Sequence, residues 1–229
     1  MLSLMTACGG SASDPEPTGT AQPAATATDP APTTADTAAP AETASTAPAT
    51  AASQAVDWTP QPGLALLEPE SGAYFGVNLD WGNDSAAAFN ERLGVDAAAY
   101  VQFAPFPFDD GWRENLRLYF EQVLAVRGIA VLTLEPTIPL DEITAAQAED
   151  LAQLLAGWNA EGVGVLLRFA HEMNGSWYGW GQQPEAYVAA FRRVADAVHA
   201  MAPGTAMLWA PNYGAGYPFS GGAYEAKPA

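Results

Sequence analysis

From Trp58 onward, the chain alternates between apolar runs and amphipathic stretches, and this alternation constrains the fold more than any other feature. The apolar runs have the length of strands, and three are nearly continuous, which is typical of strands buried on both faces of a parallel sheet. The five runs are residues 73–78, 100–104, 129–134, 163–169 and 206–210. The four stretches with a helical spacing of apolar side chains are residues 85–93, 112–126, 144–158 and 184–201. This order predicts a parallel α/β sheet of four strand–helix units and a fifth strand.

Residues at the ends of the amphipathic stretches support the helical interpretation. Thr144 stands where a helix N-cap belongs, and Pro184 suits the first turn of a helix. Gly128 and Gly204 lie just beyond two of the stretches, where the chain must reverse into a strand.

Two parallel architectures fit the alternation, and the residues after each expected strand separate them. A dinucleotide-binding fold requires a glycine-rich loop after its first strand, but this chain has Asn78-Leu-Asp-Trp81 there. Polar or aromatic residues instead follow every strand, as in barrel enzymes, which build their active sites on that face. They are Asp80, Trp81, Phe106, Phe108, Glu135, His171, Glu172 and Asn212. The sequence therefore predicts a (β/α)8 TIM barrel.

The length of the globular part is short for a barrel. A complete barrel takes about 250 residues, whereas residues 58–229 number 172. We therefore expect a partial barrel domain over residues 58–229, truncated after about the fifth strand, in a chain that is the N-terminal fragment of a longer protein.

The segment before the barrel has a different composition. Residues 9–56 contain 16 Ala, 10 Thr and 7 Pro, with no aromatic residue, Lys or Arg. Such a segment cannot bury enough apolar surface to offset the entropy of ordering it. We expect residues 9–57 to be a disordered linker, or else a low-complexity tail without a role.

The first eight residues end in Met5-Thr6-Ala7-Cys8, which resembles the end of a bacterial lipoprotein signal. That resemblance implies acylation of Cys8, an extracellular or cell-surface location, and contact with a membrane only through a lipid anchor. The positively charged region of a secretory signal is missing and the apolar region is short. The alternatives are therefore a start codon lying further upstream, or an ordinary thiol at Cys8.

Charge and cysteine content exclude several other functions. The chain has 26 acidic and 8 basic residues, a net charge of −18, so nucleic acid is not an expected partner. One cysteine excludes a disulfide framework and a cysteine-based zinc site. We expect no cofactor and no metal.

The most specific motif lies at the end of the fourth expected strand, between Leu167 and Trp180. It resembles the glycoside hydrolase family 26 β-mannanases, in which an Arg, two residues, His-Glu-Met-Asn-Gly and a tryptophan-rich loop occur together. The matching residues are Arg168, His171, Glu172, Met173, Asn174, Gly175, Trp177 and Trp180, with weaker agreement at residues 133–136 and 208–212. The resemblance implies a retaining endo-β-1,4-mannanase with Glu172 as general acid/base and His171 orienting the nucleophile. It also implies that the nucleophile is a glutamate on a seventh strand, which this sequence does not reach.

The residues themselves support a narrower conclusion. Retaining glycosidases need two carboxyl groups, and Glu172, after an apolar strand and among indoles, is in a setting that suits a general acid. The alternative is a glutamate that only caps a strand end. Indoles stack on sugar rings, and a buried Arg168 needs a carboxylate partner. The expected substrate-binding residues are Arg168, His171, Asn174, Trp177, Trp180, Trp81, Glu135 and Asn212.

Other functions remain compatible with the sequence. A carbohydrate-binding protein without catalysis could keep the tryptophans and lack a nucleophile. A β-glucanase or xylanase could share the motif. We expect the complete protein to be monomeric, and residues 57–229 alone to be inactive and prone to self-association.

Overall fold

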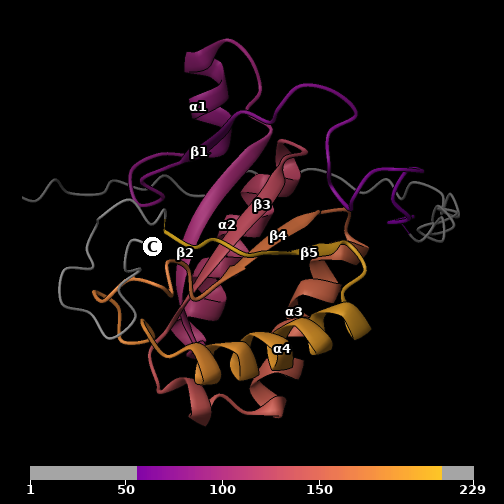
Figure 1. The fold of residues 1–229 in the computed structure, drawn as a ribbon. Helices are drawn as coiled ribbons and strands as arrows, with labels where there is room; N and C mark the ends of the chain where they lie inside the picture. The colour runs from indigo at the N-terminus through magenta and orange to yellow at the C-terminus, as the bar shows by residue number, and fades with distance from the viewer. Residues whose placement is uncertain (1–55, 213–229) are drawn as a thin grey trace, which may run out of the picture. The chain divides into compact units, whose positions relative to one another are not determined.

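A computed structural model describes residues 56–212, which contain a parallel sheet of five strands in the order β1-β2-β3-β4-β5 (Figure 1). The strands are β1 (Gly76–Asn78), β2 (Ala99–Phe106), β3 (Ile129–Pro136), β4 (Val165–Phe169) and β5 (Thr205–Leu208). Cys8, the rest of the first eight residues, the linker up to residue 55 and residues 213–229 lie outside the described residues.

A helix follows each of the first four strands. The helices are α1 (Ala86–Leu93), α2 (Asp110–Ala125), α3 (Ala145–Ala160) and α4 (Pro184–Met201), with a short 3-10 helix η1 (Leu140–Glu142) before α3. All four predicted helices and all five predicted strands are present, whereas the sequence pattern did not predict η1. Within residues 56–212, no helix is both long and apolar enough to cross a membrane.

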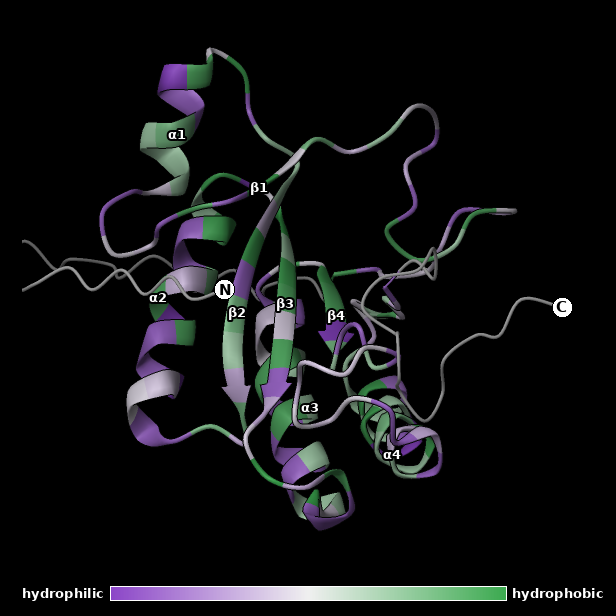
Figure 2. Cartoon of the chain, turned by 60° about the vertical axis from the view of Figure 1, so that its left-hand side comes forward, coloured by the Kyte–Doolittle hydropathy of each residue, from purple (hydrophilic) through white to green (hydrophobic). Residues whose placement is uncertain are grey.

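The strand register divides the side chains between two faces of the sheet. Phe103, Thr133 and Arg168 are paired across β2, β3 and β4 and lie on what we call the inner face. Tyr100 and Phe169 lie on the outer face, where they contact residues of the helices. Figure 2 shows hydrophobic residues, in green, along β3 and β4. The two faces therefore differ in role, because the outer face forms the core and the inner face carries polar groups.

The core between the sheet and the helices is rich in aromatic side chains. Phe120 of α2 stacks on Trp158 of α3 with ring centroids 5.1 Å apart, and Phe169 contacts Phe106 edge to face. Phe106 ends β2 within this core, and Phe108, two residues further on, packs against it. Burying each large apolar side chain contributes about 1.5–3 kcal/mol.

Local signals explain where the helices begin and end. Thr144 and Gln147 form a capping box at the start of α3, and Pro184 occupies the first turn of α4. After α2, the residue with positive φ is Arg127, at 56°. Gly128 is needed for another reason, because a Cβ atom there would lie 2.7 Å from the Tyr100 ring.

The segment before β1 packs against the amino-terminal ends of β4 and β5. The Trp58 indole donates a hydrogen bond to the Asn159 backbone oxygen at 3.2 Å. A Cβ atom at Gly204 would lie 2.4 Å from the Trp58 ring. Trp58 therefore holds this segment across the end of the sheet that lies away from the polar cluster.

The observed architecture is that of four strand–helix units and a fifth strand of a (β/α)8 barrel. Each strand pairs in parallel with the next one along the chain, and the helices alternate with the strands. The predicted fold class is confirmed for the part of the chain that the structure describes.

Candidate active site

Two unusual backbone conformations follow β4 and place Glu172 at its carboxyl end. Ala170 and Glu172 have φ values of 46° and 54°, in the left-handed region that costs a non-glycine residue about 1–2 kcal/mol. The Glu172 backbone N–H donates to the Ala210 carbonyl oxygen at 2.7 Å. This bond ties the turn after β4 to the segment after β5.

The carboxylate of Glu172 is held by an indole. The Trp177 Nε1–H donates to Glu172 Oε2 at 3.0 Å, and Trp177 is 38% exposed. A Cβ atom at Gly175 would lie 2.2 Å from the Trp177 ring, so glycine lets the ring fold back over the loop. One carboxylate oxygen of Glu172 is thus fixed by a partially exposed aromatic side chain.

Arg168 adds a positive charge to the inner face. Its Nε donates to Thr133 Oγ1 at 2.8 Å, and its guanidinium lies 5.2 Å from the centroid of the Phe103 ring. Among residues 56–212, Arg168 has no carboxylate within ion-pair distance, so its expected pairing stays a prediction. Burial lowers its pKa, while the charge of Glu172 acts in the opposite direction.

His171 is enclosed by aromatic rings and is 6% exposed. Its Nε2 lies 2.9 Å from the Tyr178 hydroxyl, and its ring meets Phe103 and Tyr178 edge to face. Burial lowers the pKa of His171, and the charge of Arg168 lowers it further. The imidazole is therefore neutral at pH 7.

Trp180 supports His171 from within the core. Its indole donates to the His171 backbone oxygen at 2.9 Å, and its ring stacks on Tyr178 with centroids 4.3 Å apart. Trp180 is 6% exposed. Because one face of its ring stacks on Tyr178, the expected stacking of Trp180 on a sugar stays a prediction.

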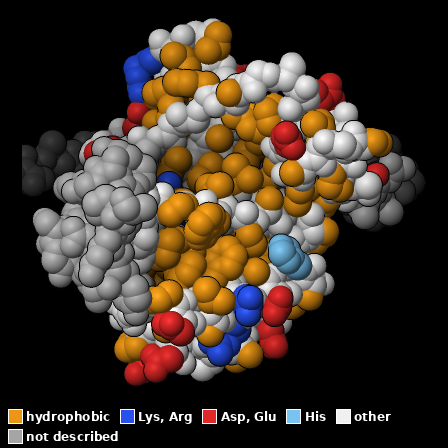
Figure 3. All heavy atoms as spheres, in the orientation of Figure 1, with side chains coloured by type: hydrophobic (Ala, Val, Ile, Leu, Met, Phe, Trp, Pro, Cys, Tyr) orange, Lys and Arg blue, Asp and Glu red, His pale blue; other side chains and the backbone are white. Residues whose placement is uncertain are grey.

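A groove of 460 Å³ adjoins these residues at the carboxyl ends of β2 and β3. Its size is that of a small-molecule site. Burial raises the pKa of Glu135 in this groove, although Arg168 opposes the effect. Figure 3 shows hydrophobic side chains gathered around a hollow over the strands. The groove is lined by Pro105, Trp112, Glu135, Pro136, Thr137, Tyr178 and Trp180.

Asn174 and Asn212 are joined to each other. Asn174 Nδ2 donates to the Asn212 backbone oxygen, and the Asn212 N–H donates to Asn174 Oδ1. The side chain of Asn174 therefore links the loops after β4 and β5, and its amide oxygen is already engaged by the protein.

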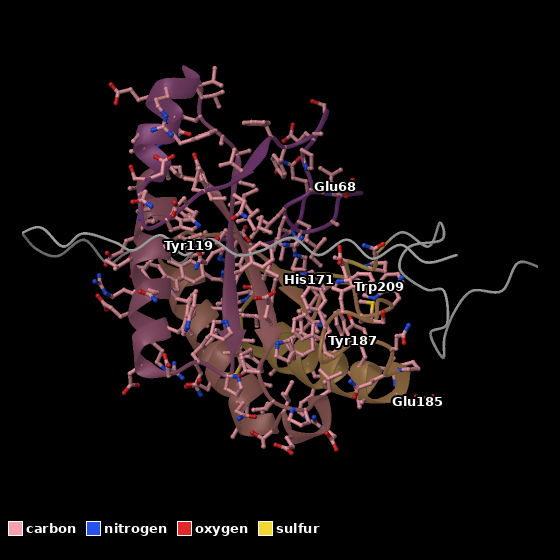
Figure 4. The ribbon with its side chains drawn as sticks, turned by 90° about the vertical axis from the view of Figure 1, so that its left-hand side faces the viewer. Glu68, Tyr119, His171, Glu185, Tyr187 and Trp209 are labelled. Atoms are coloured by element: carbon pink, nitrogen blue, oxygen red, sulfur yellow. The ribbon has the colours of Figure 1, made fainter. Side chains whose placement is uncertain are left out.

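Trp81 contacts α2, and its expected role in substrate binding stays a prediction. Its indole donates to the Val101 backbone oxygen at 2.9 Å, and its ring meets Tyr119 edge to face at 5.1 Å. Tyr119 belongs to α2, and in Figure 4 β2 lies between its label and that of His171. Trp81 therefore packs on the helix side of the sheet.

Several residues of the cluster were not predicted. Tyr178 bonds His171, Thr133 bonds Arg168, and Trp112 lines the groove. The strand alternation could have found Thr133, because it pairs with Arg168 on the inner face. The position of Tyr178 depends on the loop, for which no periodic pattern exists. No cluster of metal-binding side chains occurs within residues 56–212.

The fold and the site define a barrel-type α/β protein with a carboxylate, an imidazole and a guanidinium at the end of the fourth strand. Residues 130–224 match the model of glycosyl hydrolase family 26. The resemblance to that family is thereby confirmed over this segment, which contains β3 except for its first residue, β4, β5 and Glu172.

The chain resembles several solved structures, three of which are as follows. A modular endo-β-1,4-mannanase from Cellulomonas fimi is 15% identical, with 68% of this chain and 45% of that chain covered and a TM-score of 0.49. The YdhT protein from Bacillus subtilis is 18% identical, with coverages of 60% and 55% and a TM-score of 0.39. GH26A from Muricauda sp. MAR_2010_75 is 16% identical, with coverages of 59% and 56% and a TM-score of 0.43. The chain spans about half the length of these structures, and no curated protein matches it.

Proposed function

We propose that this chain carries the acid/base half of a retaining glycoside hydrolase site, with Glu172 as the general acid and base. The observation that carries the proposal is the hydrogen bond from the Trp177 indole to one oxygen of Glu172, beside a groove that contains a second carboxylate, Glu135. The other oxygen of Glu172 remains to deliver a proton. The nucleophile is assigned to a carboxylate outside residues 56–212.

In the first step, the protonated Glu172 gives its proton to the departing glycosidic oxygen while the nucleophile attacks the anomeric carbon. In the second step, the same carboxylate removes a proton from the attacking water. A hydrogen bond from an indole stays in place in both steps, because an indole N–H only donates. Arg168 places a positive charge on the same inner face of the sheet, and the charge of Glu172 acts on the pKa of its guanidinium.

The proposed substrate is a β-1,4-linked mannan. The aromatic residues Trp112 and Tyr178 line the groove, and Glu135 offers an acceptor for sugar hydroxyl groups. Sugar rings have apolar C–H faces that pack on aromatic rings, and the partially exposed Trp177 provides such a ring next to Glu172. Endo-mannanase activity is the specific reaction that we propose within the family that residues 130–224 resemble.

We also propose that the protein acts outside the cell, tethered through a lipid on Cys8. The proposal rests on the four residues that end at Cys8 and on the composition of the segment after it. Metabolic labelling with a fatty acid should mark the protein, and Cys8→Ser should abolish the label. If the unmodified protein takes up no label and Cys8→Ser leaves its location unchanged, the tether is contradicted. The proposed reaction is not affected by that result.

The reaction is tested by assaying products from mannan, mixed-linkage β-glucan and xylan with the complete protein that carries this chain. Glu172→Gln should lower kcat on the natural polymer by roughly 10²–10⁴-fold, which is the usual contribution of a general acid or base. Glu185→Gln is the matched control, because Glu185 is exposed in the first turn of α4 and should leave the rate unchanged.

Each outcome of the assay decides between specific functions. Mannan oligosaccharides as the main product support the proposed substrate, whereas glucan or xylan products replace it with a related one. Binding of mannan without any product, by both the unmodified protein and Glu172→Gln, would instead indicate a carbohydrate-binding protein without catalysis.

A further inference from the structure

Tyr178 is the partner that His171 contacts with its Nε2 atom. The two atoms are 2.9 Å apart, a normal hydrogen-bond distance. Tyr178 itself is fixed by stacking on Trp180, which in turn bonds the His171 backbone. The phenol and the imidazole are therefore held in one geometry by three independent contacts.

The direction of this hydrogen bond follows from the chemistry of the two groups. A phenol is a much stronger acid than a neutral imidazole N–H, and an imidazole imine nitrogen is a stronger base than a phenol oxygen. The phenol hydrogen is therefore donated to His171 Nε2.

The other ring nitrogen of His171 has a different environment. Nδ1 is buried and has no hydrogen-bond partner among the described residues. If the phenol donates to Nε2, the single proton of the neutral imidazole lies on Nδ1. A buried N–H without an acceptor is rare in folded proteins, so such a donor implies an acceptor oxygen from elsewhere in the protein or from a ligand.

We infer that Tyr178 is a positioning residue that holds neutral His171 in the Nδ1–H tautomer, so that the site keeps a fixed hydrogen-bond donor beside Glu172. The charged groups around the imidazole are Arg168 and Glu172, which act on its pKa in opposite directions. Tyr178 sets which nitrogen carries the proton, and this assignment rests on the geometry of the loop and does not require hydrolysis.

The test is nuclear magnetic resonance of the 229-residue chain labelled with 15N-histidine, at pH 7. The sequence has two histidines, so His199→Asn assigns the signals of His171 without ambiguity. We expect a protonated-type shift for Nδ1 and an imine-type shift for Nε2. Tyr178→Phe should move the tautomer ratio roughly tenfold toward Nε2–H, since it removes the one hydrogen bond that selects Nδ1–H.

Tyr187→Phe is the matched control, because it also removes a phenol hydroxyl but on α4, and it leaves the bond between Tyr178 and His171 in place. It should leave both shifts unchanged. An Nε2–H tautomer or an imidazolium in the unmodified chain would overturn the proposal, and so would a tautomer ratio that Tyr178→Phe leaves unaltered in a folded chain. A chain with the expected tautomer but no hydrolase activity would contradict the proposed function alone.

Discussion

The side chain of Asn174 and the backbone of Asn212 form two hydrogen bonds in opposite directions, each 2.8 Å long. Asn174 follows β4 and Asn212 follows β5, so the pair joins the loops that end two neighbouring strands. Together with the bond from the Glu172 N–H to Ala210, it fixes the segment that carries Glu172.

Removing this pair should loosen the loop and lower stability. Asn174→Ala leaves two backbone groups of Asn212 without partners, so the free energy of unfolding should fall by about 1–3 kcal/mol. Denaturant unfolding measures the change, with Asn83→Ala as the control because Asn83 is exposed and, within residues 56–212, its side chain bonds only Asp80. Equal small effects of both substitutions would show that the pair does not stabilise the loops.

Gly204 and Trp58 should be energetically coupled. Gly204→Ala forces a methyl group against the Trp58 ring, an overpacking that costs about 1–3 kcal/mol. In a Trp58→Ala background the indole ring is absent, so Gly204→Ala should lower the free energy of unfolding much less. A double-mutant cycle measures the coupling; an additive result would place Trp58 away from the end of the sheet.

Glu135 should make stability depend on pH. Burial raises its pKa above the ordinary value of 4.5, so the folded state holds its proton to a higher pH than the unfolded state does. The stabilising contribution is complete below pH 4.5 and is lost as the pH rises through the folded-state pKa. Glu135→Gln should therefore gain free energy of unfolding relative to the unmodified chain between pH 4 and pH 7. A difference that stays constant with pH would show that Glu135 is not desolvated.

The helices were predictable because their signals are local. Thr144 and Gln147 lie within one turn of each other, and Pro184 fixes its own φ, so neither signal depends on distant parts of the chain. The alternation of apolar runs with amphipathic stretches was then enough to predict a parallel sheet, since every strand–helix unit repeats the same pattern.

The loops were less predictable, because their side chains are placed by partners far along the chain. Trp81 was expected in the site. In the structure its indole donates a hydrogen bond to the Val101 carbonyl oxygen, and its ring packs on Tyr119 of α2. Trp180 and Trp177 are three residues apart in one motif, yet one is buried and the other is partially exposed. The sequence identifies the loop as aromatic, and only the folded loop separates the ring that supports His171 from the ring that holds Glu172.

The most direct test of the proposed role of Glu172 is azide rescue of Glu172→Ala in the complete protein, with an aryl β-mannoside as substrate. A good leaving group needs little protonation, so glycosylation should remain fast while deglycosylation becomes slow. Azide needs no general base, and it should restore turnover and give a mannosyl azide of retained configuration. An azide product of inverted configuration would make Glu172 the nucleophile, and equal loss of activity on activated and natural substrates without rescue would contradict its role as acid and base.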